Sequence, residues 1–193
     1  MGTAIVKKNA LRGRRSALLV GPALVACAVG ACSTTPTDSP PTPATTVAAK
    51  ADFDPCSDLP AAYLQREGLK RLGEPESLDN GTLKTHGCAY ISHGGLGYDV
   101  RIVRTTTTLD QIRAKFPDSY REEQFSGRRG AFYSLFPRQQ DRGESCVVNV
   151  ETRNGSLEFD LSNSKSTETG NIDSCALVRN IVTGVLPYVP AEA

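Results

Sequence analysis

After residue 50, apolar and polar residues begin to recur at the spacings of helices and strands. Residues 57–72 carry apolar side chains at mostly helical spacing, which predicts a helix that Gly73 and Pro75 end. Residues 88–93 and 97–105 alternate between apolar and polar side chains. This alternation predicts two strands that are joined by a glycine-containing turn.

The second half of the chain continues with helical and strand patterns. Thr108, followed three residues later by Gln111, predicts an N-terminal capping box for a helix that ends at residue 116. A strand is expected at residues 131–136, after an arginine- and glycine-rich stretch. Residues 146–161 then alternate on both sides of Asn154-Gly155, which predicts a hairpin with a type I′ turn.

The last element is expected to be a helix that Asp173 caps and that runs to residue 188. Its buried face is predicted to hold Leu177, Ile181, Val182, Val185 and Leu186. The order of elements predicts an α+β domain, with an antiparallel sheet of about five strands covered by helices.

The N-terminus has the three parts of a secretory signal peptide. Five basic residues come first, followed by an apolar stretch at residues 17–31 that ends in small residues before a cysteine. The apolar stretch holds about 15 residues, whereas a bilayer-spanning helix needs about 20. Residues 1–31 are therefore interpreted as a signal peptide and not as a permanent anchor.

Two cysteines compete for lipid attachment, because both follow an aliphatic residue and small residues, as in a bacterial lipobox. We favour Cys32, since the chain becomes polar directly after it, and Cys27 is the alternative. Residues 32–51 are rich in proline and threonine and are expected to form a disordered tether. The folded domain is then expected at residues 52–190. These features predict an exported protein anchored to the outer face of the cytoplasmic membrane.

The net charge of +1 is set by the signal peptide. Without residues 1–31, the chain has 17 basic and 21 acidic residues and a net charge of about −4. A mildly acidic domain gives no electrostatic reason to expect nucleic acid as a partner.

Four cysteines remain in the folded part: Cys56, Cys88, Cys146 and Cys175. An even number in an exported domain predicts two disulfides, and the wide spacing without a CxxC pair argues against a zinc site. Three connectivities are possible. We favour Cys56–Cys88 and Cys146–Cys175, because each would join the start of a helix to the start of a strand.

Several of these features occur in a characteristic order: the lipobox, the tether, Asp54-Pro55-Cys56, Gly87-Cys88-Ala89-Tyr90, Cys146-Val147-Val148-Asn149-Val150 and Asp173-Ser174-Cys175. In this order the chain resembles the actinobacterial lipoprotein family known as domain of unknown function 3558. The resemblance implies a lipid-anchored envelope protein with two disulfides. It implies no activity and no catalytic residues.

The sequence nominates no catalytic residues, metal ligands or cofactor. His86 and His93 are interpreted as solvent-facing or turn histidines, and paired carboxylates such as Asp52 and Asp54 as solvated groups. We therefore expect a non-enzymatic binding or accessory module that engages an unknown envelope protein or polymer. The alternative is an enzyme acting on envelope glycans or lipids. A deep pocket holding two carboxylates, or a nucleophile beside His86 or His93, would contradict the binding-module interpretation.

One cluster is a candidate surface for an anionic partner, because arginine and aromatic residues are enriched at interfaces. The candidate contact residues are Arg121, Arg128, Arg129, Arg138 and Tyr133, with Arg142 nearby in the sequence. The competing interpretation is a solvated loop whose aromatic side chains are buried.

Overall fold

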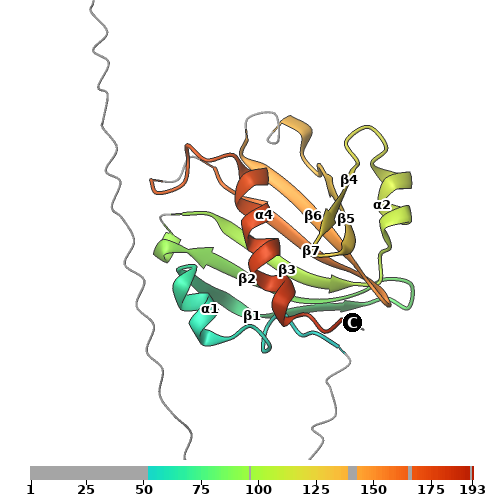
Figure 1. Cartoon of the computed structure of the whole chain (residues 1–193), viewed down its shortest axis with the longest axis horizontal. Helices are drawn as coiled ribbons and strands as arrows, with labels where there is room; N and C mark the ends of the chain where they lie inside the picture. Colours follow the sequence, from blue (N-terminus) through green and yellow to red (C-terminus); the bar gives the residue numbers. More distant parts are fainter. Residues whose placement is uncertain (1–51, 96, 139–142, 165–166, 192) are drawn as a thin grey trace, which may run out of the picture. The chain divides into compact units, whose positions relative to one another are not determined.

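A computed structural model describes residues 52–95, 97–138, 143–164, 167–191 and 193. They form one antiparallel sheet of seven strands in the order β1-β2-β3-β7-β6-β5-β4, with helices packed on it (Figure 1). The expected α+β class is supported roughly, because the sheet dominates and has seven strands instead of about five. The expected signal peptide, the tether and both candidate lipid cysteines lie outside the described residues.

The elements follow the chain with short connections. The strands are β1 (Leu69–Asp79), β2 (Lys84–Ser92), β3 (Asp99–Thr105), β4 (Arg121–Phe125), β5 (Arg128–Tyr133), β6 (Ser145–Thr152) and β7 (Gly155–Ser162). The helices are α1 (Ala61–Arg66), α2 (Leu109–Lys115) and α4 (Ser174–Val185), and the short 3₁₀ turns are η1 (His93–Gly95) and η2 (Leu186–Tyr188).

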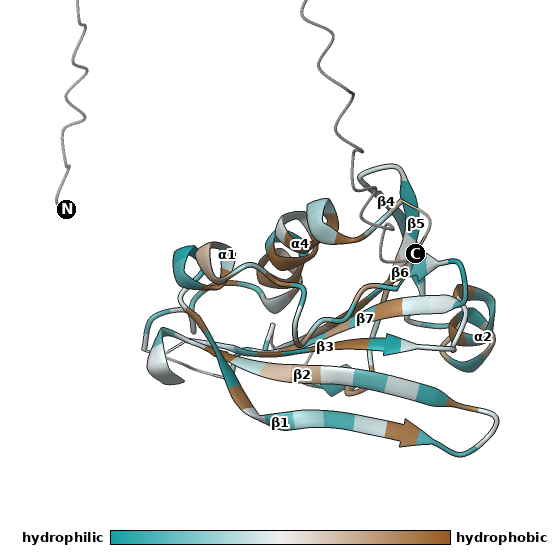
Figure 2. Ribbon diagram, turned by 90° about the horizontal axis from the view of Figure 1, so that it is seen from below, coloured by the Kyte–Doolittle hydropathy of each residue, from teal (hydrophilic) through white to brown (hydrophobic). Residues whose placement is uncertain are grey.

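The main core lies between the sheet and helices α1 and α4, which are on the same side of it (Figure 2). Side chains alternate along β6 and β7, so Val148 and Phe159 enter this core and are fully buried. Helix α2 packs on the opposite face, where Leu109 and Ile112 contact Tyr133 in a smaller cluster. The sheet therefore has two faces with different helical cover.

The final helix agrees with the sequence prediction. Asp173 caps α4 by accepting a hydrogen bond from the backbone N–H of Ala176 at 3.1 Å. All five residues expected on its buried face are buried in the structure: Leu177, Ile181, Val182, Val185 and Leu186. The capping box of Thr108 and Gln111 at the start of α2 is also confirmed.

The helix expected at residues 57–72 is wrong at both ends, because α1 spans only Ala61–Arg66. Helix α1 ends at Arg66, because Gly68 takes a φ of 63° that turns the chain into β1. Gly73 and Pro75 do not end an element. They lie where the register of β1 against β2 shifts between Leu72 and Glu76, a bulge in which proline removes no hydrogen bond from the ladder.

The two tight hairpin turns differ from the prediction. A type I′ turn requires positive φ at both loop residues, and Ser126 and Gly127 meet this requirement with φ of 49° and 84° between β4 and β5. The β6–β7 turn does not have this form, since neither Arg153 nor Asn154 has a positive φ. Gly155 has a φ of 141°, and a Cβ there would lie 2.1 Å from the carbonyl oxygen of Thr105. Glycine is needed at this position because another strand end approaches the backbone.

The arginine- and glycine-rich stretch forms the β4–β5 hairpin, which the sequence analysis did not predict. The expected strand at 131–136 accordingly begins earlier, at Arg128, and ends at Tyr133.

Two disulfides join the helical layer to the sheet. Cys56 is bonded to Cys88 in β2, with a Cα–Cα distance of 5.3 Å. Cys146 in β6 is bonded to Cys175 in the first turn of α4, with a Cα–Cα distance of 5.1 Å. This is the pairing that we favoured from the sequence.

Candidate functional site

A cavity of about 400 Å³ lies beside the β1–β2 turn, on the face of the sheet that carries α4. Buried apolar side chains form part of its lining: Phe53, Leu157 and Val189. Charged side chains of both signs also line the cavity. Asp52 pairs with Arg104 at 3.2 Å, and Asp79 pairs with Lys84 at 3.1 Å. The cavity therefore combines an apolar lining with polar groups.

Ser77 and His86 also line this cavity and contact each other. They are direct partners across the β1–β2 pair, so the strand register places them together. The Oγ atom of Ser77 lies 2.7 Å from Nδ1 of His86, and Nε2 of His86 lies 3.2 Å from Oδ1 of Asp54. A hydroxyl, an imidazole and a carboxylate thus follow one another through hydrogen bonds.

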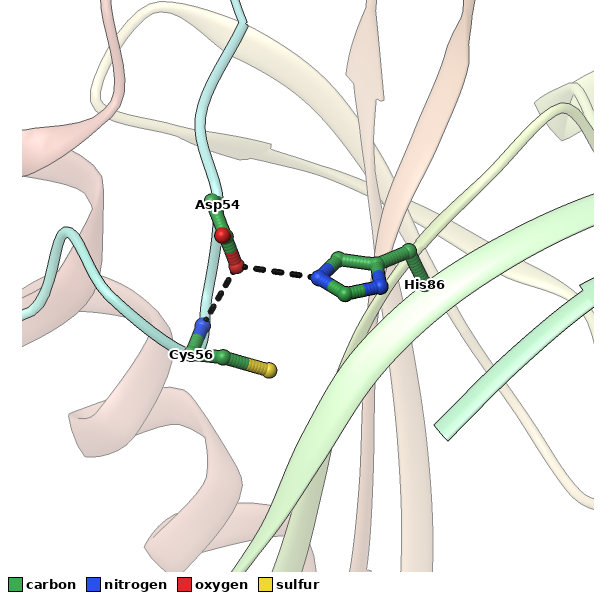
Figure 3. Close-up of side chains that lie close together, drawn as sticks. All are labelled: Asp54, Cys56 and His86. Carbon is green, nitrogen blue, oxygen red and sulfur yellow. Dashed lines mark hydrogen bonds and ion pairs between the residues drawn. The ribbon is translucent and has the colours of Figure 1, made fainter. Parts of the chain in front are cut away.

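Asp54 receives several hydrogen bonds in the segment before α1. Its Oδ1 atom accepts from the backbone N–H of Cys56 at 2.8 Å (Figure 3). Its Oδ2 atom accepts from the Ser57 hydroxyl at 2.9 Å. Burial alone would raise the pKa of Asp54, but these hydrogen bonds and the nearby His86 outweigh burial and lower that pKa. Asp54 is therefore an anion at neutral pH.

The charge on Asp54 determines the hydrogen-bond roles of the neutral imidazole. The Nε2 atom of His86 must carry the hydrogen that faces the Asp54 carboxylate, so its Nδ1 atom has a lone pair. The Ser77 hydroxyl then donates to Nδ1. His86 is half-buried at 31% side-chain exposure, and it is not the solvent-facing or turn histidine that we expected. His93 is exposed and lies in the turn after β2.

The segment that carries Asp54 is tied to β2 at two further points. The Cys56–Cys88 disulfide is one of them, and the hydrogen bond from the Tyr90 hydroxyl to the carbonyl oxygen of Pro55, at 2.5 Å, is the other. These two links fix the segment that carries Asp54 to β2. They thereby hold the Asp54 carboxylate beside His86.

Asp54, Cys56 and His86 also have the spacing of a metal site, because their ligand atoms lie within 4.8 Å of one another. The sulfur of Cys56 is bonded to Cys88, however, and a disulfide sulfur is not the thiolate that binds zinc. Only the carboxylate and the imidazole of this group are then available as ligands. The arrangement does not fit a structural zinc site while the disulfide is intact.

The arginine cluster does not form one surface. Arg128 and Arg129 are successive residues of β5, so they lie on opposite faces of the sheet. Arg128 donates to the carbonyl oxygens of Pro190, Val189 and Ala193. Arg129 forms ion pairs with Glu122 and Glu151 at 2.9 and 3.3 Å. Both guanidinium groups therefore have partners within the domain.

Arg121 and Tyr133, two further members of the cluster, also lie on opposite faces of the sheet. Arg121 stacks over the Phe132 ring at 5.1 Å, and Arg179 from α4 stacks over the same ring at 4.9 Å. Arg138 is exposed, whereas Tyr133 is 2% exposed and lies on the α2 face. Arg142 lies outside the described residues. The sequence grouped residues that the strand alternation separates.

Sequence reasoning missed Ser77 as a functional candidate. Ser77 follows the segment that was expected to be a helix with a stop signal, so no strand partner was assigned to it. The pairing of Ser77 with His86 depends on the β1–β2 register, and no local sequence signal marks that register.

Comparisons with known proteins identify a family but no characterised relative. No curated protein and no solved structure matches the chain. Among the described residues, no helix is both long and apolar enough to cross a membrane. A family model described as "Protein of unknown function (DUF3558)" matches residues 22–188, which is most of the chain. The chain therefore belongs to the DUF3558 family of proteins of unknown function.

Proposed function

We propose that this protein is an exported, lipid-anchored envelope protein whose folded domain is a non-enzymatic binding or accessory module. The export and anchoring part rests on the N-terminal signal pattern and on the lipobox before Cys32, with Cys27 as the alternative. The family match begins at residue 22, so both cysteines lie inside the matched region. Two disulfides fit an oxidising compartment outside the cytoplasm.

Lipid attachment is tested by a matched pair of variants, Cys32→Ser and Cys27→Ser. Metabolic labelling with an alkyne fatty acid and mass spectrometry of the mature N-terminus measure the modification. We expect Cys32→Ser to abolish both the label and the cleavage before residue 32, and Cys27→Ser to retain them. Loss of the label only in Cys27→Ser would move the anchor to Cys27, and retention in both variants would refute the lipid anchor.

The binding role rests on the cavity of about 400 Å³ beside the β1–β2 turn. Ligand sites in proteins are typically concave, largely apolar and about 300–1,000 Å³ in volume, with a few polar groups that orient the ligand. The Asp52–Arg104 and Asp79–Lys84 pairs are exposed at the rim of this cavity. Exposed pairs are weak, so a polar ligand replaces them at a small cost in free energy.

A photo-crosslinking amino acid placed at Asn154 tests this role in cells. Asn154 lines the cavity and is exposed in the β6–β7 turn. Ala114, exposed on α2, is the matched control position. We expect Asn154 to yield a discrete product that mass spectrometry identifies, and Ala114 not to yield it. Identical products at both positions, or no product at Asn154, would contradict a binding role for the cavity.

A second candidate function is hydrolysis or group transfer with Ser77 as the nucleophile. Ser77 beside His86 in the cavity is the arrangement that the sequence led us to count against a binding module. His86 Nδ1 is placed to accept the Ser77 proton, and Asp54 to stabilise the protonated ring. Ser77 lies within an extended strand, however, where successive N–H groups point to opposite edges. The N–H groups of Ser77 and Leu78 therefore do not converge on one oxyanion, unlike the paired donors that acyl-transfer enzymes use.

A fluorophosphonate probe separates the two functions, since it modifies only activated serine hydroxyls. The binding module predicts no labelling of the intact protein. Labelling that is lost in Ser77→Ala and His86→Gln, but kept in Ser57→Ala, would establish the enzyme instead. Ser57 is the matched control, because its hydroxyl contacts Asp54 and Asp58 and not His86.

A further inference from the structure

A second concave site lies on the opposite face of the sheet, between α2 and strands β2, β3, β5 and β7. This groove has a volume of about 490 Å³. Its walls are largely apolar and aromatic, with contributions from Val103, Ile112, Phe116, Tyr133 and Leu135. The Phe116 and Tyr133 rings stack on each other with centroids 4.9 Å apart. Threonine hydroxyls from the β2 and β3 ends line the rim.

Among the described residues, Glu158 of β7 is the only acidic residue that lines the groove. Its Oε2 atom accepts a hydrogen bond from the Tyr133 hydroxyl at 3.1 Å. Glu158 has no cation within ion-pair distance in this part of the chain, and the nearby Arg101 pairs with Glu76 at 2.8 Å. Burial raises the pKa of Glu158, and the Tyr133 hydrogen bond and the charge of Arg101 offset this only in part.

Among the described residues, Lys115 of α2 is the only basic residue that lines the groove. Its Nζ atom lies 5.2 Å from the centroid of the Phe116 ring. The Lys115 side chain is exposed. The Phe116 ring therefore already contacts one ammonium group, that of Lys115. Within the described part of the chain, the Glu158 carboxylate has no ammonium group beside it.

We propose that the groove binds the side chain of a lysine from a peptide partner, with Glu158 as the counter-ion of its ammonium group. The four methylene groups pack against Val103, Ile112 and Phe116. The peptide backbone lies along the threonine rim, whose hydroxyls can both donate and accept hydrogen bonds. A lysine fits better than an anion or a neutral chain, because only a cation compensates a half-buried carboxylate in an apolar wall.

The direct test is an NMR titration of the uniformly ¹⁵N-labelled domain with Nα-acetyl-lysine N-methylamide. The norleucine analogue, which lacks the ammonium group, is the matched control ligand. We expect the lysine probe to shift amide signals of β7 and α2, with a dissociation constant of roughly 1 mM. The norleucine analogue is expected to bind at least about tenfold more weakly, because it lacks the charge-assisted hydrogen bond to Glu158.

Two variants report on the residues involved. Glu158→Gln keeps the shape and the contact with Tyr133 and is expected to weaken the lysine probe about tenfold. Glu151→Gln, a carboxylate on the same face that Arg129 already neutralises, should leave the affinity unchanged. Lys115→Gln removes the competing ammonium group and should strengthen binding.

Equal binding of the norleucine analogue, an unchanged affinity in Glu158→Gln, or shifts confined to other surfaces would each overturn the proposal. If Glu158→Gln unfolds, the spectrum loses its dispersion, and the Lys115→Gln result then decides. The groove and the cavity lie on opposite faces of the sheet. Failure here therefore leaves the proposed role of the cavity unaffected.

Discussion

Removal of the Cys146–Cys175 disulfide should lower the free energy of unfolding by about 3.6 kcal/mol in the chain-entropy account of disulfides. That figure follows from the sequence separation of 29 between the two cysteines. The bond joins β6, in the middle of the sheet, to the first turn of α4. Because the bond limits the unfolded chain, its loss should also raise the denaturant slope as the unfolded state expands.

The assay is urea unfolding of the oxidised protein and of Cys146→Ala/Cys175→Ala, followed by far-UV circular dichroism. The matched control is Cys56→Ala/Cys88→Ala, which opens a loop of nearly equal length, with a sequence separation of 32. The chain-entropy account gives about 3.7 kcal/mol for this second bond. The two pairs should therefore be almost equally destabilised, since each bond also joins one cysteine buried in the main core to one at its edge.

Unequal losses would refute this reasoning. A loss below about 1 kcal/mol in either pair would mean that chain entropy does not set the stabilisation. A much larger loss in one pair than in the other would mean that local packing dominates, because Cys88 and Cys146 are almost equally buried and the cost of the cavity left by each replacement depends on its site. An unchanged denaturant slope would show that the unfolded state does not expand. Each outcome can be read from the same set of unfolding curves.

Three further predictions concern local features. Burial raises the pKa of Glu158 above its ordinary value of 4.5, so the folded state holds a proton that the unfolded state releases. The free energy of unfolding should therefore fall as the pH rises above about 4.5, until the pH passes the pKa of the folded state. Urea unfolding across pH 4–8 should show a flatter profile for Glu158→Gln, and parallel profiles would contradict this assignment. Gly155→Ala should lose at least about 2 kcal/mol, because its Cβ would meet Thr105 at a φ of 141°; a thermal melt with an unchanged midpoint would exclude the clash. Thr108→Ala should lose about 1 kcal/mol with the capping box, and hydrogen exchange in α2 should quicken, whereas unaltered exchange would show that the cap is dispensable.

The elements that the sequence predicted well carry their signal locally. The buried face of α4 repeats at helical spacing, and Asp173 marks its start. The hairpin of β6 and β7 alternates on both sides of a turn. The favoured cysteine pairing is confirmed, but its reason holds for one pair only. Cys146 and Cys175 lie at the starts of β6 and α4, whereas Cys88 lies in the middle of β2 and Cys56 precedes α1.

The missed elements carry signals that fit two structures. Leu69 and Leu72 match the helical spacing of the preceding residues, but Leu69 is buried in β1 and Leu72 is 53% exposed on it. Only the bend at Gly68 separates the helix from the strand. In the β4–β5 hairpin, the paired charges of Glu122 and Arg129 hide the alternation, since both strands are polar on their exposed face.

The candidate site depends on pairings between distant residues, so the sequence could supply its parts but not their arrangement. His86 and Asp54 were both noted, and each was assigned a solvated or turn position. Their contact spans 32 residues and requires the Cys56–Cys88 bond and the β2 register together. The prediction of one arginine surface was wrong for the converse reason, because residues that are neighbours in the sequence point to opposite faces of a strand.

The width of the sheet explains why concave sites occur on both faces. Seven strands at a spacing of about 4.8 Å make a sheet about 29 Å wide, whereas one helix with its side chains covers about 10–12 Å. On the first face α1 and α4 together leave the β1–β2 end to the segment around Phe53, and the cavity forms there. On the second face α2 alone covers β5 and β6, so the groove forms along its inner edge and Leu72 and Leu78 of β1 stay exposed. Both sites thus lie where helical cover ends, and a ligand in either would extend the cover of an incompletely buried sheet.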